Sequence, residues 1–276
     1  MPARHIGSVA VNAATVLQCI LAATLCAQPA TENPVLKKPY FQRLANLRAN
    51  AESLDPEDVA ELREILRDSP EEARLRPGQL HAYKNEIANI LFAREPVPQG
   101  LPGQFIAMAE EEVQGSVWRD YCIQHLGANL ENFAPAVRRE CVKLFYRKTR
   151  KSKAGIAGTA LIALSNASEL HEVDIERVAR RAYEVVADEK MGPARMTALQ
   201  ICVENGFSKA LPLARELADS ASDINLRASA LAAVGILGGA EDVALLERSA
   251  KSGLYRVRTA AKAALARLER REAASG

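Results

Sequence analysis

Aromatic residues are scarce in this chain of 276 residues: they make up 5% of it, with one Trp, although 48% of all residues are hydrophobic. β-Sheets draw heavily on aromatic and β-branched side chains, whereas Ala and Leu, which are abundant here, suit closely packed helices. The shortage disfavours a sheet protein. The composition therefore predicts an all-α fold.

The chain also lacks an excess of charge of one sign. Lys and Arg number 36 against 34 Asp and Glu, which leaves a net charge of +2. Dedicated nucleic-acid binders usually carry a broad basic excess, so no specific nucleic-acid partner is predicted. Any charged partner must be recognised by a local cluster.

Cysteine is too sparse for a disulfide framework. Beyond residue 27 the chain holds three, Cys122, Cys141 and Cys202, an odd number at wide spacing. Disulfide scaffolds use even numbers of closely spaced cysteines. Free Cys packs as a small hydrophobic residue, so we expect all three to be buried in helical core.

Histidine is equally sparse, and His81, His125 and His171 have no zinc-type spacing to one another or to a Cys pair. No Gly-rich phosphate loop, nucleophile elbow or Walker sequence is present. The sequence therefore predicts no catalytic, metal-binding or cofactor-binding residues, no cofactor and no enzymatic activity.

The first 27 residues differ from the rest. Arg4 and His5 precede an uncharged stretch that ends in small residues at Ala27, and polar Gln28 follows. This order is typical of a secretory signal peptide, and the alternative is an uncleaved anchor, which would be the chain's only contact with a membrane. The protein is therefore predicted to be exported, to the periplasm or the extracellular space.

A division of the chain follows from composition and helix signals. Asp55-Pro56 is a strong helix start, with an N-cap and a Pro at the first helical position. The predicted segments are a signal peptide (1–27), a linker (28–38), an N-terminal helical segment (39–78, with a first helix over 40–50), a repeat array (79–272, opening with a helix over 79–94) and a disordered tail (273–276).

The array is predicted from internal similarity. Residues 226–235 match residues 194–203 at a spacing of 32 and the segment from residue 257 at a spacing of 31. Residues 118–127 match the same template, and a degenerate copy covers 157–164. Spacings of 31 to 38 residues fit two short helices and two turns, so each unit exposes an apolar face that its neighbour covers.

The matched positions are few and specific. Small residues recur at Ala198, Ala230 and Ala261, and glycine ends two copies at Gly127 and Gly235. An arginine recurs at Arg119, Arg195, Arg227 and Arg258, and its recurrence indicates a requirement of the fold. Second helices are expected between the matched ones, over residues 135–150, 173–188, 210–219 and 240–251.

This pattern resembles the HEAT-like repeats of the phycobilisome-lyase type, in which an apolar residue and Arg precede small and apolar residues ending near Gly. The resemblance is clear over residues 192–271 and good at 117–127. It implies a right-handed α solenoid, or α-α superhelix, of HEAT-type helix pairs, in which the recurring arginine bonds neighbouring turns. HEAT-fold hydroxylases with a di-iron centre use several His-Glu pairs, whereas this chain has only His171-Glu172.

One charge cluster remains as a candidate binding site. No acid occurs between Glu140 and Glu169, and six cations gather near one expected turn: Lys143, Arg147, Lys148, Arg150, Lys151 and Lys153. A solvated basic turn is the plainer interpretation. The functional one is a docking point for an anionic partner, whether an acidic protein, a polysaccharide or lipid headgroups, because neighbouring cations add their potentials.

Solenoids offer extended surfaces for binding and need no cofactor. The sequence therefore predicts a non-enzymatic HEAT-repeat scaffold that binds a protein or peptide on the concave face formed by its second helices. A phycobilin-lyase-like enzyme on the same solenoid is the alternative. A pocket with a buried carboxylate would favour that alternative.

We expect the mature protein to begin near Gln28, because the small-residue run ends at Ala27 and the composition turns polar there. Mass spectrometry of the N-terminal peptide from exported protein measures this. Recovery of an intact Met1 terminus from the soluble fraction would contradict both the signal peptide and the predicted location.

Overall fold

The computed structural model describes residues 34–68, 75–151 and 154–274. The chain divides into two compact units, residues 1–46 and 47–276. The described part of the first unit belongs to helix α2 (Pro34–Ala49). This helix begins at Pro34, inside the segment that was predicted as a linker (28–38). The predicted linker therefore extends too far along the chain. Proline suits the first position of a helix, where its missing N–H costs nothing. The predicted signal peptide lies outside the described residues.

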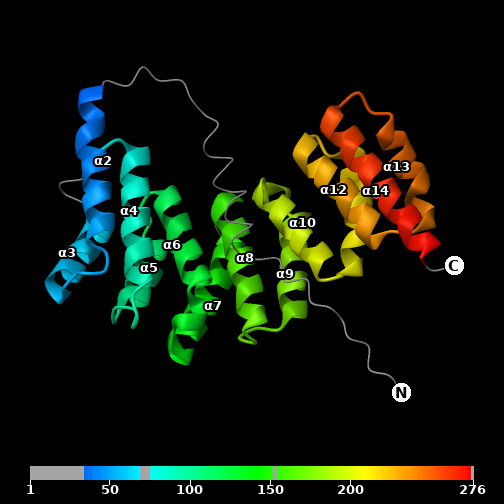
Figure 1. Ribbon diagram of the computed structural model, residues 1–276. Coiled ribbons are helices and arrows are strands. Elements are labelled where there is room, and N and C mark those ends of the chain that lie inside the picture. Colours follow the sequence, from blue (N-terminus) through cyan, green and yellow to red (C-terminus); the bar gives the residue numbers. More distant parts are fainter. Residues whose placement is uncertain (1–33, 69–74, 152–153, 275–276) are drawn as a thin grey trace. The chain divides into compact units, whose positions relative to one another are not determined.

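The second unit is a series of antiparallel helices joined by short turns (Figure 1). Its described residues contain no strand. The helices are α3 (Pro56–Arg67), α4 (Pro77–Phe92), α5 (Leu101–Glu110), α6 (Ser116–Ala128), α7 (Pro135–Lys151), α8 (Ala154–Glu169), α9 (Ile175–Ala187), α10 (Ala194–Glu204), α11 (Leu211–Ser220), α12 (Ile224–Leu237), α13 (Val243–Ala250) and α14 (Tyr255–Ala273).

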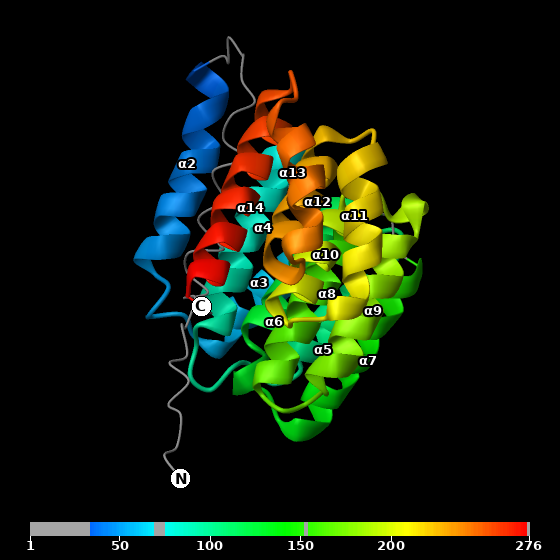
Figure 2. The same cartoon turned by 90° about the vertical axis from the view of Figure 1, so that its right-hand side faces the viewer.

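These helices form two layers (Figure 2). The first layer holds α4, α6, α8, α10, α12 and α14, each in contact with the next. The second layer holds α3, α5, α7, α9, α11 and α13, and each of its helices packs on the first-layer helix that follows it in sequence. The all-helical α solenoid predicted from the repeats is therefore confirmed.

Four predicted second helices correspond to α7, α9, α11 and α13, but α5 was missed. The sequence Pro98 to Gly103 reads as a helix terminator. In the structure, Gly100 instead takes a left-handed conformation (φ 78°) just before α5, and Pro102 lies in its first turn. Helix α4 already ends at Phe92, and because Gly and Pro are both tolerated at a helix start, Gly100 and Pro102 begin α5 instead.

The predicted boundary between residues 78 and 79 does not separate two compact units. The second unit starts at Leu47 and includes α3. Helix α3 is fixed by Asp55, whose carboxylate accepts from Glu57 N (2.8 Å) and Asp58 N (2.9 Å). Its apolar side buries Leu62 and Leu66. The first pair of the array is therefore α3 with α4.

Glycine allows the first-layer helices to approach closely. A Cβ built on Gly127 of α6 would lie 2.7 Å from Ala163 Cβ of α8, and one on Gly235 of α12 would lie 2.6 Å from Ala264 Cβ of α14. Both distances are far shorter than a van der Waals contact. The glycine that ends two repeat copies is therefore required by packing between successive units. The matched Ala198, Ala230 and Ala261 are all fully buried beside this contact surface.

The recurring arginine closes the open end of the helix before it. Arg195 Nε donates to Val186 O (2.7 Å), Arg227 Nε to Ala218 O (2.9 Å), and an Arg258 guanidinium nitrogen to Ser252 O (2.9 Å). These carbonyls lie in the last turn of α9, in the last turn of α11 and just after α13. A cation at a helix C-terminus satisfies free carbonyls and opposes the negative end of the dipole.

Two units depart from this arginine rule. Arg119 Nε of α6 is buried and has no hydrogen-bond partner among the described residues. In α8 the matching position is Ala157, and the end of α7 is closed by Arg181 of α9, which donates to Thr149 Oγ1 (2.8 Å) and Thr149 O (2.6 Å). The structural role predicted for the arginine is therefore confirmed for Arg195, Arg227 and Arg258.

We expect Gly235→Ala to destabilise the protein by about 1–2 kcal/mol, although Ala is the better helix former by ~1 kcal/mol. The added methyl would overlap backbone atoms of Ala264, 2.7 Å from its Cα. Gly103→Ala is the matched control, because a Cβ at Gly103 in α5 meets nothing within 4 Å. In urea unfolding, Gly235→Ala should lower the free energy of unfolding and Gly103→Ala should raise it. Equal stabilisation by both variants would exclude the close contact.

Candidate functional site

The candidate site is a row of cations on the outer side of α7. This helix carries seven cations and one acid. Arg139, Lys143, Arg147 and Arg150 are all exposed, and steps of four, four and three residues place them on one face of a helix. We call these four residues the basic stripe. Arg139 was missed from the sequence because it precedes Glu140, where the acid-free run begins.

Ion pairs partly neutralise the basic stripe. Lys143 Nζ lies 2.8 Å from Glu140 Oε1 on the same helix, and Arg147 Nε donates to Glu110 Oε1 of α5 over 2.9 Å. Although the sequence has a run without acids here, Glu140 and Glu110 therefore lie beside two of its cations in the folded chain. Arg139 and Arg150, at its two ends, are the members that remain most open to an anionic group.

Of the other residues predicted for this site, Lys148 faces inward. It is half-buried, and burial lowers the pKa of its ammonium group, with Glu110 opposing that effect and Arg119 adding to it. A half-buried amine beside α5 contributes less to an exposed binding surface. The Lys151 side chain and Lys153 lie outside the part of the chain that the structure describes.

Helix α9 extends the basic surface beside α7. The Arg177 guanidinium lies 4.7 Å from the centre of the Tyr146 ring of α7, a cation–π contact. Arg180 is exposed and lies 3.1 Å from Glu176. Arg138 at the start of α7 is paired with Glu172 at 3.0 Å. The second layer at α7 and α9 therefore presents a mainly cationic surface, with exposed Arg177 over the half-buried Tyr146 ring.

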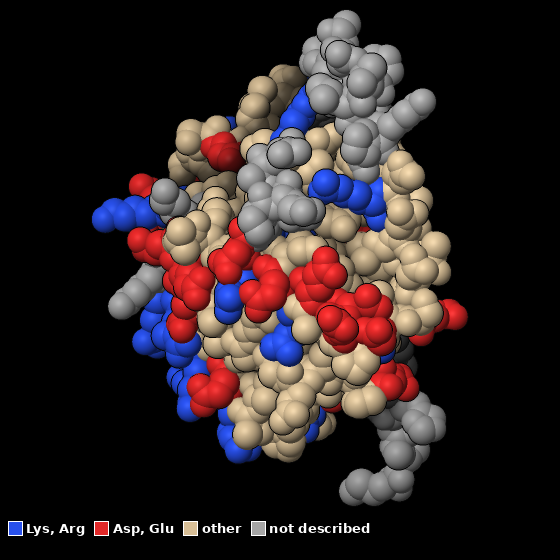
Figure 3. Space-filling model, turned by 90° about the vertical axis from the view of Figure 1, so that its left-hand side faces the viewer, with Lys and Arg blue, Asp and Glu red and all other residues tan. Residues whose placement is uncertain are grey.

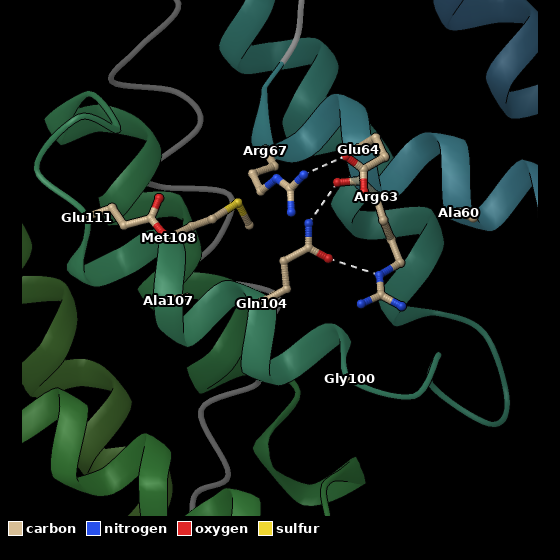
Figure 4. Close-up of a pocket in the computed structure, with 9 residues that line it drawn as sticks. All are labelled: Ala60, Arg63, Glu64, Arg67, Gly100, Gln104, Ala107, Met108 and Glu111. Carbon is tan, nitrogen blue, oxygen red and sulfur yellow. Dashed lines mark hydrogen bonds and ion pairs between the residues drawn. The ribbon is translucent and has the colours of Figure 1, made fainter.

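A groove lies between α3 and α5 (Figure 4). Its volume is about 550 Å³, and its walls are Ala60, Arg63, Glu64, Arg67, Gly100, Gln104, Ala107, Met108 and Glu111. Arg63 Nε donates to Gln104 Oε1 (2.9 Å), and Gln104 Nε2 donates back to Arg63 O (2.7 Å). Arg67 lies 2.8 Å from Glu64. The polar groups of this groove thus bind one another.

The cysteines are buried, as expected. Cys122, Cys141 and Cys202 carry free thiols that are fully shielded from solvent. Burial raises the pKa of the Cys141 and Cys202 thiols to about 12 and that of Cys122 further still. A thiol with a raised pKa stays protonated and unreactive, so these residues fill space in the core.

His125 lies at the centre of an aromatic core, at the position where two other repeat copies have the apolar residues Ile201 and Ala233. Its Nε2 lies 2.9 Å from Asn85 Oδ1, and its ring stacks on Phe92 at 5.7 Å. Phe105 lies edge-on at 5.8 Å, and Trp118 packs on Phe105. Because the amide oxygen can only accept, Nε2 carries the proton of a neutral imidazole.

His171 lies in the turn between α8 and α9, with a left-handed backbone (φ 58°). Asp174 caps α9 through Glu176 N at 2.8 Å, which fits the expected helix start. In the described residues, no group of three His, Cys, Asp or Glu side chains is placed to hold a metal ion.

One partly buried carboxyl group bears on the enzymatic alternative. Burial raises the pKa of the Asp120 carboxyl group in α6. A hydrogen bond with Thr159 of α8 opposes this effect and lowers the pKa. Its Oδ1 has no hydrogen-bond partner. Asp120 lies at the contact between two first-layer helices and is not among the residues that line the groove.

The layered array and its repeated arginine and glycine contacts define a helical repeat protein, an α solenoid. No protein-family model and no curated protein sequence matches the chain. In the helices that the structure describes, none is long and apolar enough to cross a membrane.

Solved structures similar to this chain include a designed repeat protein and a human enzyme. A designed armadillo repeat protein has a TM-score of 0.44 and 14% identity, over 76% of this chain and 99% of that one. Human deoxyhypusine hydroxylase in complex with glycerol has a TM-score of 0.34 and 16% identity, over 93% of this chain and 98% of that one. Neither carries a functional inference for this chain.

We expect stability to fall between pH 7 and pH 5 because of His125. Burial lowers the pKa of its imidazole to about 4, while the unfolded chain has a value near 6.5. The unfolded state then binds more protons over this range, so the stability contribution is complete above the unfolded pKa and is lost as the pH falls toward 4. The loss is on the order of 2 kcal/mol at pH 5.

Urea unfolding at both pH values checks this, with His125→Gln as the comparison. Gln retains an amide for Asn85 but has no titrating group, so its stability should change less with pH. Burial and Lys84 also lower the pKa of His81, so His81→Gln measures the part of the pH dependence that comes from this second histidine. An unchanged pH dependence in His125→Gln would contradict the assignment.

Proposed function

We propose that this protein is a non-enzymatic α-solenoid scaffold that binds an acidic segment of a protein partner on its second layer. The observation that carries the proposal is the basic stripe of α7, whose end members Arg139 and Arg150 are exposed and form no ion pair with the described residues. The partner is expected on second-layer helices, which form one extended surface. Predicted export places this binding outside the cytoplasm.

The geometry supports an acidic protein segment in particular. Four cations in a row span about 16 Å along the helix, at a rise of ~1.5 Å per residue. A partner helix or extended chain with acids at matching intervals would meet all four, whereas a single small anion would meet only one or two. The Arg177–Tyr146 pair beside the stripe adds an apolar and cationic surface for side chains of the partner.

Binding of this kind depends on several weak contacts. Exposed ion pairs contribute roughly 0.2–1 kcal/mol each and are screened by salt. Arginine and lysine at an exposed surface also speed the encounter with an anionic partner. The proposal therefore implies moderate affinity that falls steeply as the salt concentration rises.

We expect Arg139→Glu combined with Lys143→Glu to weaken binding of a glutamate-rich helical peptide about tenfold or more. Two attractions become two repulsions, on the order of 1–3 kcal/mol in sum. Fluorescence anisotropy with a labelled peptide measures this, and the same peptide with Gln in place of Glu should not bind.

The matched control is Lys262→Glu combined with Arg267→Glu, the same charge change on exposed positions of α14. Circular dichroism should show that both variants remain folded. Equal loss of binding in the two variants would mean that only net charge matters. Unchanged binding in the α7 variant would exclude the basic stripe as the site.

A further inference from the structure

Helix α3 carries a row of acids that matches the basic stripe. Glu57, Glu61, Glu64 and Asp68 are all exposed, and steps of four, three and four residues place them on one face. We call them the acidic stripe. Asp and Glu side chains also gather on the face of the molecule seen from the α3 side, at the level of that helix (Figure 3).

The two stripes are alike in length and opposite in charge. Each extends over twelve residues, from Glu57 to Asp68 and from Arg139 to Arg150, and the eleven steps between its end residues correspond to about 16 Å of helix. Residues 50–68 hold seven acids and two arginines, one of which, Arg63, is half-buried and hydrogen-bonded to Gln104. Arg67 pairs with Glu64 and Asp68, so Glu57 and Glu61 are the most open carboxylates.

The acidic stripe is held on a fixed helix. On its inner side, α3 buries Leu62 and Leu66. Lys84 of α4 is buried and donates to Leu66 O at 2.7 Å, which closes the C-terminal end of α3. A preorganised helix loses little conformational entropy when it is bound.

The two stripes do not meet within one molecule. Helix α5 lines the groove with α3 on one side and contacts α7 on the other. Its Glu110 is the acid that reaches Arg147, while the acids of α3 remain exposed to solvent. Pairing of the two stripes therefore requires two molecules.

We propose that the acidic stripe of one molecule docks on the basic stripe of a second copy of this chain, so that the protein is its own acidic partner. This inference rests on the proposed function, because it names an occupant of the same α7 surface. The contact joins different surfaces of the two copies. If the acidic stripe of each copy docks on the basic stripe of the other, the two copies form a closed dimer. If each copy docks on a different neighbour, an open chain of copies forms.

Sedimentation velocity of the full chain over a range of concentrations tests the proposal. The parent protein should associate at low salt and dissociate in 0.5 M NaCl, where the Debye length falls to about 4 Å. Glu57→Lys with Glu61→Lys should lose self-association at least tenfold yet still bind the glutamate-rich peptide. Arg139→Glu with Lys143→Glu should lose both.

A mixing experiment gives the decisive result. Each variant alone has one stripe in which two of the four charges are reversed, so this stripe has no net charge and no longer attracts the other. A mixture of the two variants restores one contact between unaltered stripes, the acidic stripe of the α7 variant and the basic stripe of the α3 variant. A one-to-one mixture should therefore associate while neither variant does alone. The α14 variant, Lys262→Glu with Arg267→Glu, is the control and should associate like the parent.

The outcomes separate the two proposals. A parent protein that stays monomeric at low salt, but binds the peptide through α7, overturns self-association and leaves the proposed function standing. Loss of association in the α14 variant alone, or a mixture that fails to associate, also overturns the docking described here. Failure of the peptide to bind to the parent, at concentrations where the chain is monomeric, overturns the proposed function itself.

Discussion

Close packing of the first-layer helices is the constraint on which the rest of the array depends. Gly127 against Ala163 and Gly235 against Ala264 bring neighbouring helices nearer than any side chain would allow. The helix before each of them packs on it from the second layer. The small residues therefore set the close spacing of these first-layer helices, and the outer face of the second layer is left exposed.

Cations serve two different purposes in this structure. Lys84, Arg195, Arg227 and Arg258 donate to carbonyls at or beyond the ends of second-layer helices, where they satisfy groups that water would otherwise bind. The cations of the basic stripe point outward on α7 and make few contacts within the chain. A near-neutral total charge thus conceals one basic and one acidic surface, and this separation is what the proposed binding uses.

Much of the candidate site could be predicted, but its limits could not. The cluster at Lys143, Arg147 and Arg150 was visible as an acid-free run, whereas Arg139 belongs to it only through helical periodicity. Glu110 lies more than thirty residues away in sequence and still pairs with Arg147, because α5 and α7 are neighbours in the second layer. Lys148 lies one residue further along and turns inward. A run of charges in the sequence does not show which charged residues of other helices lie beside it in the folded chain.

By itself, the sequence determined the helical class, the repeat spacing and the positions where small residues and arginine recur, because helix formation and close packing leave a local and periodic pattern. It also determined that His125 and the three cysteines belong to the core, since apolar residues surround them or stand at matched positions. Only the tertiary structure decided which helix each unit packs against, that α5 exists between two turn signals, and that the arginine reaches back to the preceding helix. Those outcomes depend on contacts between residues that are distant in sequence, and such contacts form only when the layers are assembled.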